Sequence, residues 1–315
     1  MMKLGMHRAF LALGLSFSLS AHAAAQDAKL DLKARKGHTA EYTVKESTTS
    51  DFGGGARASE SEITYLIEVA EKKDNGDAVL KVTYKSVKAK QEGGNNAWEF
   101  DSAKTEGGDE LAAQLRKTIA SPITVEVSGG KITEISGIAE PERQEGAEPR
   151  EGFRRARAGR IAGRGAIERH IGWILATPAQ NQKLEKGKEY KQEARRQEAA
   201  GGSENRRGRG FGRDFLLAYK FDGEEKAGGA PAAKFKLSAF RQPAGADAPE
   251  QRGELKSDGT ALVSLEDGLL LKLDLTTDSK IEFERDGETR SFSSKSKITV
   301  ERKSSGAKEV RTAAL

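Results

Sequence analysis

The sequence predicts a mainly β protein made of two antiparallel β lobes, each a curved sheet or half-barrel with one short covering helix. Two observations lead to this fold class. Apolar and polar residues alternate through most of the chain, which is the period of a β-strand, and Asn-Gly or Asp-Gly steps separate many of the alternating stretches. Only two short stretches have helical periodicity, and a short amphipathic helix is most simply a cover for one face of a sheet.

The firmest local prediction is a β-hairpin over residues 61–88. Its first strand alternates through Ile63 to Val69 and its second through Leu80 to Tyr84. Between them lies Asn75-Gly76, a pair that readily adopts the positive φ angles of a tight hairpin turn.

Further strands are expected along the rest of the chain. One begins after Pro122, and Gly129-Gly130 turns it into the next. In the C-terminal part, Asp222-Gly223 follows an alternating stretch, and Asp-Gly steps are expected to separate the later strands. These later strands are predicted at 215–221, 235–237, 262–265, 269–275, 280–284 and 297–302, with steps at Asp258-Gly259, Asp267-Gly268 and Asp286-Gly287.

Two helices are predicted, at 109–120 and 165–176. In the first, Leu111, Leu115 and Ile119 recur every four residues and therefore share one helix face. In the second, Ile167 and Ile171 begin an apolar stripe, with Trp173 beside it, and Pro178 lies just past the end.

These elements divide the chain into five parts. They are a leader at 1–24, an N-terminal β lobe at 25–140, an Arg/Gly-rich linker with the second helix at 141–177, a C-terminal β lobe at 178–304 and a disordered tail at 305–315. Each lobe opens with Lys-Gly before a strand that carries a tyrosine, Tyr42 in the first and Tyr190 in the second, which suggests a duplication.

The N-terminus has the layout of a secretory signal peptide. Lys3 and Arg8 precede an apolar stretch from Ala9 to Leu19, and small residues follow it. Because this stretch is shorter than the ~20 residues of a membrane-spanning helix, we expect cleavage between Ala23 and Ala25 rather than a retained anchor. The protein is therefore expected to be periplasmic or secreted.

Composition narrows the possible functions. The chain has no Cys, so no disulfide can form, and stability must come from a buried core. Loss of Lys3 and Arg8 with the leader lowers the formal net charge from +5 to +3, which does not favour a nucleic-acid partner.

Two Arg-rich stretches, 141–165 and 194–213, combine Arg with Gly and lack apolar periodicity. They are interpreted as solvated loops. The alternative is contact with an anionic surface such as lipid or polysaccharide, for which the candidate residues are Arg154, Arg155, Arg157, Arg206, Arg207 and Arg209.

No catalytic constellation, cofactor site or metal site is recognisable. Only His38 and His170 remain after the leader, and neither is near a nucleophile motif. His170 is interpreted as a partly buried helix residue. Asp residues fall mostly in predicted turns, and Asp74-Asn75-Gly76-Asp77 lacks the full ligand ladder of a calcium loop.

The order of several short motifs resembles a loosely defined family of exported bacterial β-rich proteins of unknown function. The motifs are the stretch from Leu30 to Val44, Gly130-Lys131-Ile132-Thr133-Glu134-Ile135, Leu184 to Tyr190 and Asp267-Gly268-Leu269-Leu270-Leu271. The resemblance implies a signal peptide and β-rich lobes. It implies no activity, and no functional residue is carried over.

Three functions remain open. The preferred hypothesis is an exported, non-catalytic binding or envelope-associated protein whose ligand is a hydrophobic or lipid-like molecule, with the row Leu269, Leu271, Leu273 and Leu275 serving as core or as groove lining. The alternatives are a hydrolase that uses only carboxylates and a structural module that docks partners through strand edges or the Arg-rich loops. The oligomeric state is left open.

Overall fold

The computed structural model describes residues 29–51, 55–93, 97–104, 110–138, 159–192, 215–241, 252–285 and 288–307. The predicted leader and most of the two Arg-rich stretches lie outside these ranges. The elements are β1 (Lys29–Leu30), β2 (His38–Asp51), β3 (Ala56–Lys72), β4 (Ala78–Glu92), β5 (Trp98–Asp101), α1 (Glu110–Ala120), β6 (Ile123–Ser128), β7 (Lys131–Ser136), α3 (Arg164–Ile174), β8 (Gln182–Lys183), β9 (Glu189–Lys191), β10 (Phe215–Ala227), β11 (Ala230–Arg241), β12 (Arg252–Ser264), β13 (Leu270–Arg285) and β14 (Glu288–Ala307).

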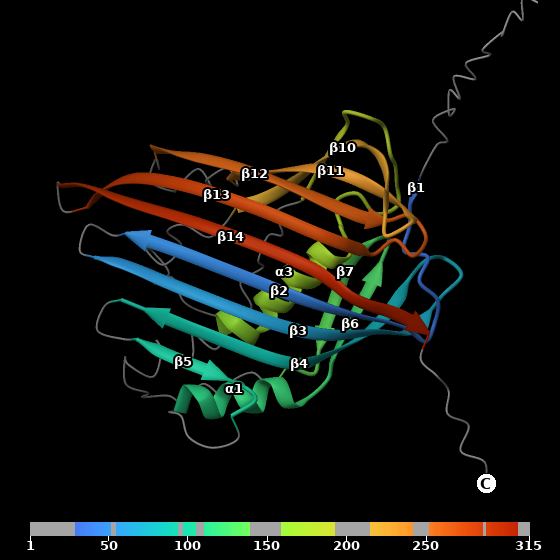
Figure 1. Cartoon of the computed structure of the whole chain (residues 1–315), viewed down its shortest axis with the longest axis horizontal. Helices are drawn as coiled ribbons and strands as arrows, with labels where there is room; N and C mark the ends of the chain where they lie inside the picture. Colours follow the sequence, from blue (N-terminus) through green and yellow to red (C-terminus); the bar gives the residue numbers. More distant parts are fainter. Residues whose placement is uncertain are drawn as a thin grey trace, which may run out of the picture.

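Twelve strands form one continuous antiparallel sheet, shown in Figure 1, which confirms the predicted mainly β class. The strand order is β7-β6-β4-β3-β2-β14-β13-β12-β11-β10-β9, and β5 pairs with the edge of β4. The strands of the two predicted lobes are joined where β14 pairs with β2 along His38–Asp51. The expectation of two separate lobes is therefore wrong, because the lobes share one sheet. A separate two-stranded sheet joins β1 to β8.

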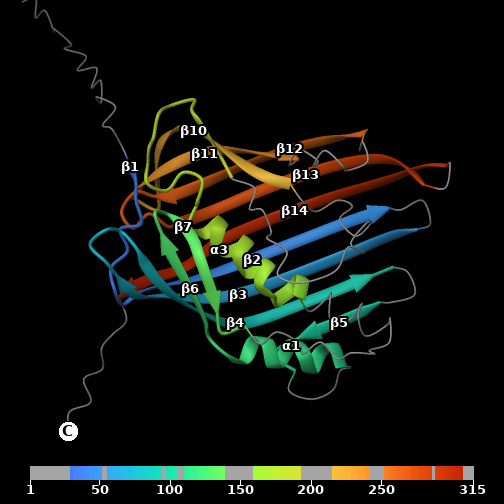
Figure 2. The same cartoon turned by 180° about the vertical axis from the view of Figure 1, so that it is seen from behind.

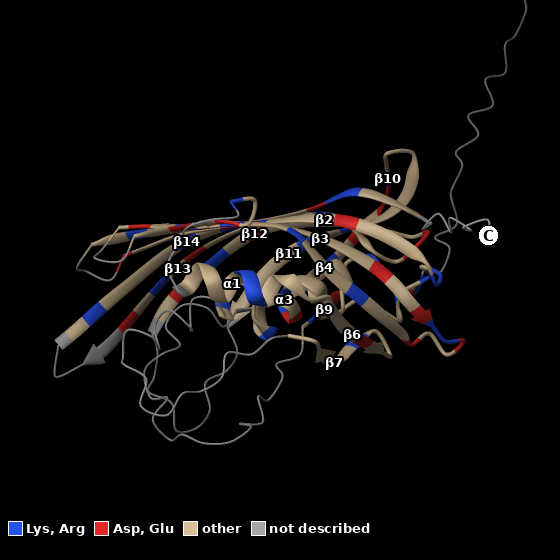
Figure 3. Cartoon of the chain, turned by 90° about the horizontal axis from the view of Figure 1, so that it is seen from below, with Lys and Arg blue, Asp and Glu red and all other residues tan. Residues whose placement is uncertain are grey.

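The sheet curves around the side that carries both helices. In Figures 1 and 2 α3 lies against one face of β2 and β3, and in Figure 3 the sheet arches over α1 and α3. We call this side the inner face and the opposite side the outer face. Because α3 contacts both β7 and β13, it crosses from one predicted lobe to the other and does not cover a lobe of its own.

The predicted hairpin at 61–88 is confirmed, and its strands are longer than expected. β3 and β4 pair from Ala58 and Glu92 to Lys72 and Ala78, and Gly76 in the turn has φ +91°. The turns at Gly129-Gly130 and Asp267-Gly268 are also as predicted. Asp286-Gly287 lies outside the described residues, between strands that pair as far as Arg285 and Glu288.

Two predicted turns are wrong. Asp222-Gly223 lies within β10, where the register with β11 shifts at a bulge, and the hairpin turns instead at Gly228-Gly229. Asp258-Gly259 lies in the middle of β12, where Gly259 pairs with both Leu237 and Leu275. A strand glycine can mark a bulge or a close approach of neighbouring groups, so Asp-Gly alone does not define a turn.

The strands near the C-terminus are longer than predicted. The predicted strands at 269–275 and 280–284 are one strand, β13, and β14 continues to Ala307, three residues into the predicted tail. The Ser- and Thr-rich stretches that interrupt the apolar alternation here remain in the ladder, because backbone pairing satisfies their N–H and C=O groups without apolar side chains.

Both predicted helices form. α1 covers Glu110–Ala120, and the predicted first residue, Asp109, lies outside the described residues. α3 covers Arg164–Ile174 in place of 165–176. The apolar stripe of α3 is fully buried, including Ile167, Ile171 and Ile174. Packing of this stripe on the inner face therefore accounts for the position of the helix.

The turn between β12 and β13 anchors the N-terminal segment. The backbone oxygen of Asp267 accepts hydrogen bonds from the N–H groups of Lys33 and Ala34. The turn can lie close to the backbone of Asp31 because residue 268 is a glycine. A Cβ at this position would lie 1.9 Å from the backbone oxygen of Asp31. Its φ of +76° also lies in the left-handed region that favours glycine.

We predict that Gly268→Ala lowers the free energy of unfolding by about 3 kcal/mol or more, since backbone strain and overpacking each cost about 1–3 kcal/mol. Gly187→Ala is the matched control. Gly187 has φ +86°, but a Cβ added there would have no described atom within 4 Å, so only the conformational cost of about 1–2 kcal/mol is expected. Urea unfolding of both variants measures the difference, and equal losses would contradict the proposed close approach.

Candidate functional site

The outer face of the sheet carries a ladder of alternating charges. Across β5, β4, β3 and β2, the residues in register are Asp101, Lys88, Glu62 and Lys45. Lys45 Nζ lies 2.9 Å from Glu62, and in the neighbouring row Lys90 Nζ lies 3.2 Å from Glu60. Opposite charges on adjacent strands attract, so this face is a solvated and internally neutralised surface.

A hollow of about 560 Å³ lies over this ladder, lined by residues of β2, β3, β4, β5 and β14. It brings together the carboxylates Glu60, Glu62, Glu99 and Asp101, which bears on the hypothesis of a carboxylate hydrolase. Glu60, Glu62 and Glu99 each form an ion pair with a lysine. The hollow is therefore lined by acid–base pairs and not by two carboxyl groups that face one reacting bond, as glycoside hydrolysis requires.

The inner face carries a row of three buried tyrosines, Tyr42, Tyr65 and Tyr84, in register on β2, β3 and β4. Each hydroxyl has a partner. Tyr42 donates to the backbone oxygen of Leu270 at 2.8 Å, Tyr84 donates to that of Ala162 at 3.0 Å, and the hydroxyl of Tyr65 lies 2.8 Å from Nδ1 of His170. The row thus connects the sheet to α3 and to the segment before it.

His170 is the centre of a polar cluster between α3 and the sheet, in which the side chains of Glu46 and Arg169 are partly exposed. His170 itself is fully buried, whereas the sequence suggested only partial burial. Its Nε2 atom lies 3.5 Å from Oε1 of Glu46, and Arg169 lies 3.2 Å from the same oxygen. Trp173 completes the cluster, with its ring 5.4 Å from that of His170 and 5.6 Å from the guanidinium of Arg169.

The environment of the cluster shifts the pKa values of its members. Burial lowers the pKa of His170, and the nearby carboxylate of Glu46 opposes that shift only in part. Burial alone would raise the pKa of Glu46, but hydrogen bonding and charge from His170 and Arg169 lower this pKa to about 2. At neutral pH the cluster therefore holds a neutral imidazole and an ionised carboxylate paired with Arg169.

Tyr219 differs from the other four tyrosines of the chain. It lies on the inner face of β10, fully buried, and its ring packs edge-on against Phe235 at 5.8 Å. Among the described residues, its hydroxyl has no hydrogen-bond partner, and the same is true of the buried hydroxyl of Thr277 on β13. Tyr190, beside it on β9, has a hydroxyl that donates to the backbone oxygen of Lys183.

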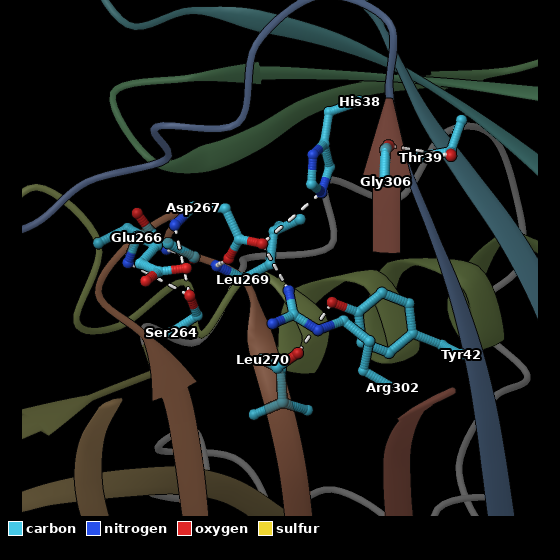
Figure 4. A network of polar contacts seen from close by, with 12 residues as sticks. His38, Thr39, Tyr42, Ser264, Glu266, Asp267, Leu269, Leu270, Arg302 and Gly306 are labelled. Carbon is cyan, nitrogen blue, oxygen red and sulfur yellow. Dashed lines mark hydrogen bonds and ion pairs between the residues drawn. The ribbon is translucent and has the colours of Figure 1, made fainter. Parts of the chain in front are cut away.

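A second polar network joins the β12–β13 turn to β2 and β14 and is shown in Figure 4. Asp267 accepts a hydrogen bond from Arg302 at 2.5 Å, and Nε2 of His38 lies 3.6 Å from the same carboxylate. Asp267 also accepts the backbone N–H of Leu269 through Oδ1. These contacts connect the β12–β13 turn to the ends of β2 and β14, which gives the network a structural role.

The described part of the chain contains none of the predicted site residues, because all six Arg candidates lie outside it. Leu269, Leu273 and Leu275 are buried, whereas Leu271 is only partly buried. Among the described residues, no three His, Asp or Glu side chains converge on a possible metal position. None of the described helices is both long and apolar enough to span a membrane.

The sequence alone did not indicate Glu46, Tyr65 and Arg169 as partners of His170. The only available signal was the position of His170 within the apolar stripe of a predicted helix, which indicates burial and therefore a need for polar partners.

The fold defines a class of protein: a single open antiparallel sheet with a helix across its inner face. No known family matches the sequence, and no curated protein matches it. Ten chains of solved structures show similarity. One is from a structure described as lipid–protein interactions in lipovitellin, with 11% sequence identity and a TM-score of 0.44 over 89% of this chain. The similarity covers only 26% of that chain.

We predict that Tyr65→Phe lowers the free energy of unfolding by about 1–3 kcal/mol, because it leaves the buried Nδ1 of His170 without a partner. Thermal or urea unfolding at neutral pH measures the change. A variant as stable as the parent would show that the hydroxyl–imidazole contact does not hold α3 on the sheet.

Proposed function

We propose that this protein is exported and holds an apolar, lipid-like molecule against the inner face of its sheet, without catalysing a reaction on it. The contrast between the two faces supports this proposal. The outer face is neutralised by its own charge ladder, whereas the buried side chains of the inner face are mainly apolar, with Glu46 and His170 in a local polar cluster. An apolar ligand would therefore bind on the inner face.

The single observation that carries the proposal is the hydroxyl of Tyr219. All five tyrosines are buried, and four of them have hydroxyls hydrogen-bonded to the chain. A buried hydroxyl without a partner costs about 1–3 kcal/mol, and Phe would avoid this cost at the same position. A bound molecule with a hydrogen-bond acceptor near Tyr219 would satisfy the hydroxyl within its apolar surroundings.

The alternatives have less support. Three carboxylates of the outer hollow, Glu60, Glu62 and Glu99, are paired with lysines, which does not favour a hydrolase. Docking of another strand is less favoured at the β7 edge of the sheet, because the oxygen of Ile135 accepts a hydrogen bond from Arg164.

Export is tested by the mass of the protein recovered from a bacterial culture. We expect a periplasmic or secreted product whose N-terminus begins between Ala24 and Gln26, as cleavage between Ala23 and Ala25 requires. Unprocessed protein confined to the cytosol would contradict the proposal.

Ligand binding is tested with the variant Tyr219→Phe. The parent and the variant are extracted with organic solvent, and the extracts are analysed by mass spectrometry for co-purified apolar molecules. A dansyl-labelled undecanoic acid then serves as the probe. We expect the variant to bind it about fivefold to tenfold more weakly, the loss of roughly one hydrogen bond. The ligand-free variant should be more stable by about 1 kcal/mol, because an unsatisfied hydroxyl has been removed.

Tyr190→Phe is the matched control, because its ring packs against the same Phe235 at 6.4 Å but its hydroxyl already has a partner in the chain. It should lose stability and keep its affinity for the probe. An extract without apolar molecules, together with no binding of the probe, would overturn the proposed function. Equal affinities of the parent and Tyr219→Phe would remove Tyr219 from the site.

A further inference from the structure

We propose that Glu46 and His170 form a proton-operated latch that holds α3 on the inner face at neutral pH and releases it in acid. The latch joins elements that are distant in the chain: His170 on α3 contacts Tyr65 on β3 and faces Glu46 on β2. An effect of this movement on the binding of a ligand rests on the proposed function. The movement of α3 itself does not.

A neutral His170 can suit both of its neighbours in one of its tautomers. If the hydroxyl of Tyr65 donates to Nδ1, then Nε2 carries the hydrogen and directs it toward Glu46, 3.5 Å away. A neutral imidazole therefore suits both neighbours. In addition, Glu46 keeps its charge for Arg169, which it binds through both carboxylate oxygens.

Glu46 is the carboxylate that acts on His170, and Arg169, also on α3, is the cation. β4 contributes Tyr84 to the surroundings. α3 also packs on β7 and β13, whose buried side chains do not ionise in this pH range: Ile132, Ile135, Leu270, Leu273, Leu275, Thr277, Ser279 and Ile281. A protonated His170 would thus share the carboxylate of Glu46 with Arg169, and the side chains of these two partners are partly exposed.

Protonation of His170 is the event that weakens the latch. The pKa of His170 is lower when α3 is docked than the 6.5 of a free imidazole, so its contribution is complete above pH 6.5 and is lost as the pH falls. The pKa of Glu46 is lowered to about 2, despite its burial, by hydrogen bonding and charge from His170 and Arg169, so its carboxylate stays ionised throughout this range. Acid therefore favours release of α3, and release exposes the apolar surface beneath it.

Trp173 reports the position of α3 directly, because it lies on the helix and is buried. The chain has two Trp, so Trp98→Phe leaves Trp173 as the single tryptophan, whose fluorescence is excited selectively. In this background we expect the acrylamide quenching constant to rise about threefold between pH 7 and pH 4.5, while the far-ultraviolet dichroism of the strands stays constant.

Two variants distinguish protonation of His170 from effects of acid on other groups of the protein. His170→Asn keeps an acceptor for Tyr65 but cannot titrate, so its quenching should not change above pH 4.5. His38→Asn removes the other histidine of the processed chain, which faces Asp267, and should behave as the parent. A flat profile for the parent, or the same rise in His170→Asn as in the parent, would overturn the latch.

If His170→Asn does not fold, the titration of the two histidine rings is measured by nuclear magnetic resonance in the parent protein. Protonation of His170 should coincide with exposure of Trp173 in the parent protein. Titration of His170 without a change in Trp173 would overturn the proposal. Loss of strand dichroism at the same pH would also overturn it, because this would show global unfolding. None of these readouts depends on a bound ligand, so the latch and the proposed function can fail separately.

Discussion

The pairing of β2 with β14 is the constraint on which the rest of the structure depends. It joins strands from the two ends of the chain along fourteen residues of β2, and it makes one sheet where two lobes could have formed. Because the sheet is continuous, it has a single inner face, and one helix can cross from β7 to β13. Arg302 on β14 and His38 on β2 meet Asp267 at one end of this pairing, which ties the β12–β13 turn to it.

The two faces of the sheet are chemically different because successive side chains of each strand point to opposite faces. On the outer face, charged side chains satisfy one another or water, so little binding energy is available there for an apolar molecule. On the inner face, polar atoms must find partners inside the protein. Most do so through α3 and the three tyrosines of β2, β3 and β4. Within the described part of the chain, the hydroxyls of Tyr219 and Thr277 do not, and both lie on the C-terminal half of the sheet. Nε2 of His170 and Oε1 of Gln180 are also buried without a hydrogen-bond partner among the described residues.

The position of α3 determines access to part of the inner face. The hollow that the structure shows lies on the outer face, while α3 covers the inner face through buried apolar and polar contacts. Movement of α3 would open the part of the inner face that the helix covers. The polar cluster of Glu46, Arg169 and His170 is the part of that contact whose strength depends on protonation, whereas the apolar stripe of the helix is independent of pH.

Local patterns in the sequence predicted the elements better than their arrangement. Alternation and Asn75-Gly76 predicted the β3–β4 hairpin, and apolar spacing predicted both helices. The β2–β14 pairing could not be predicted, because residues 38–51 and 288–307 are far apart and no local signal links them. Asp258-Gly259 was misleading, because a strand tolerates this pair where Leu275 from the next strand lies against the glycine. The site could not be predicted either, since Glu46, Tyr65 and His170 meet only after the sheet has formed.

The central claim is that the inner face holds an apolar molecule from outside the chain. A crystal structure of the protein, purified from the exported fraction without detergent or organic solvent, tests it most directly. The account predicts elongated electron density between the sheet and α3, with an acceptor atom within hydrogen-bond distance of the Tyr219 hydroxyl. An inner face filled only by the protein's own side chains, with this hydroxyl bonded to the chain or to water, would contradict it.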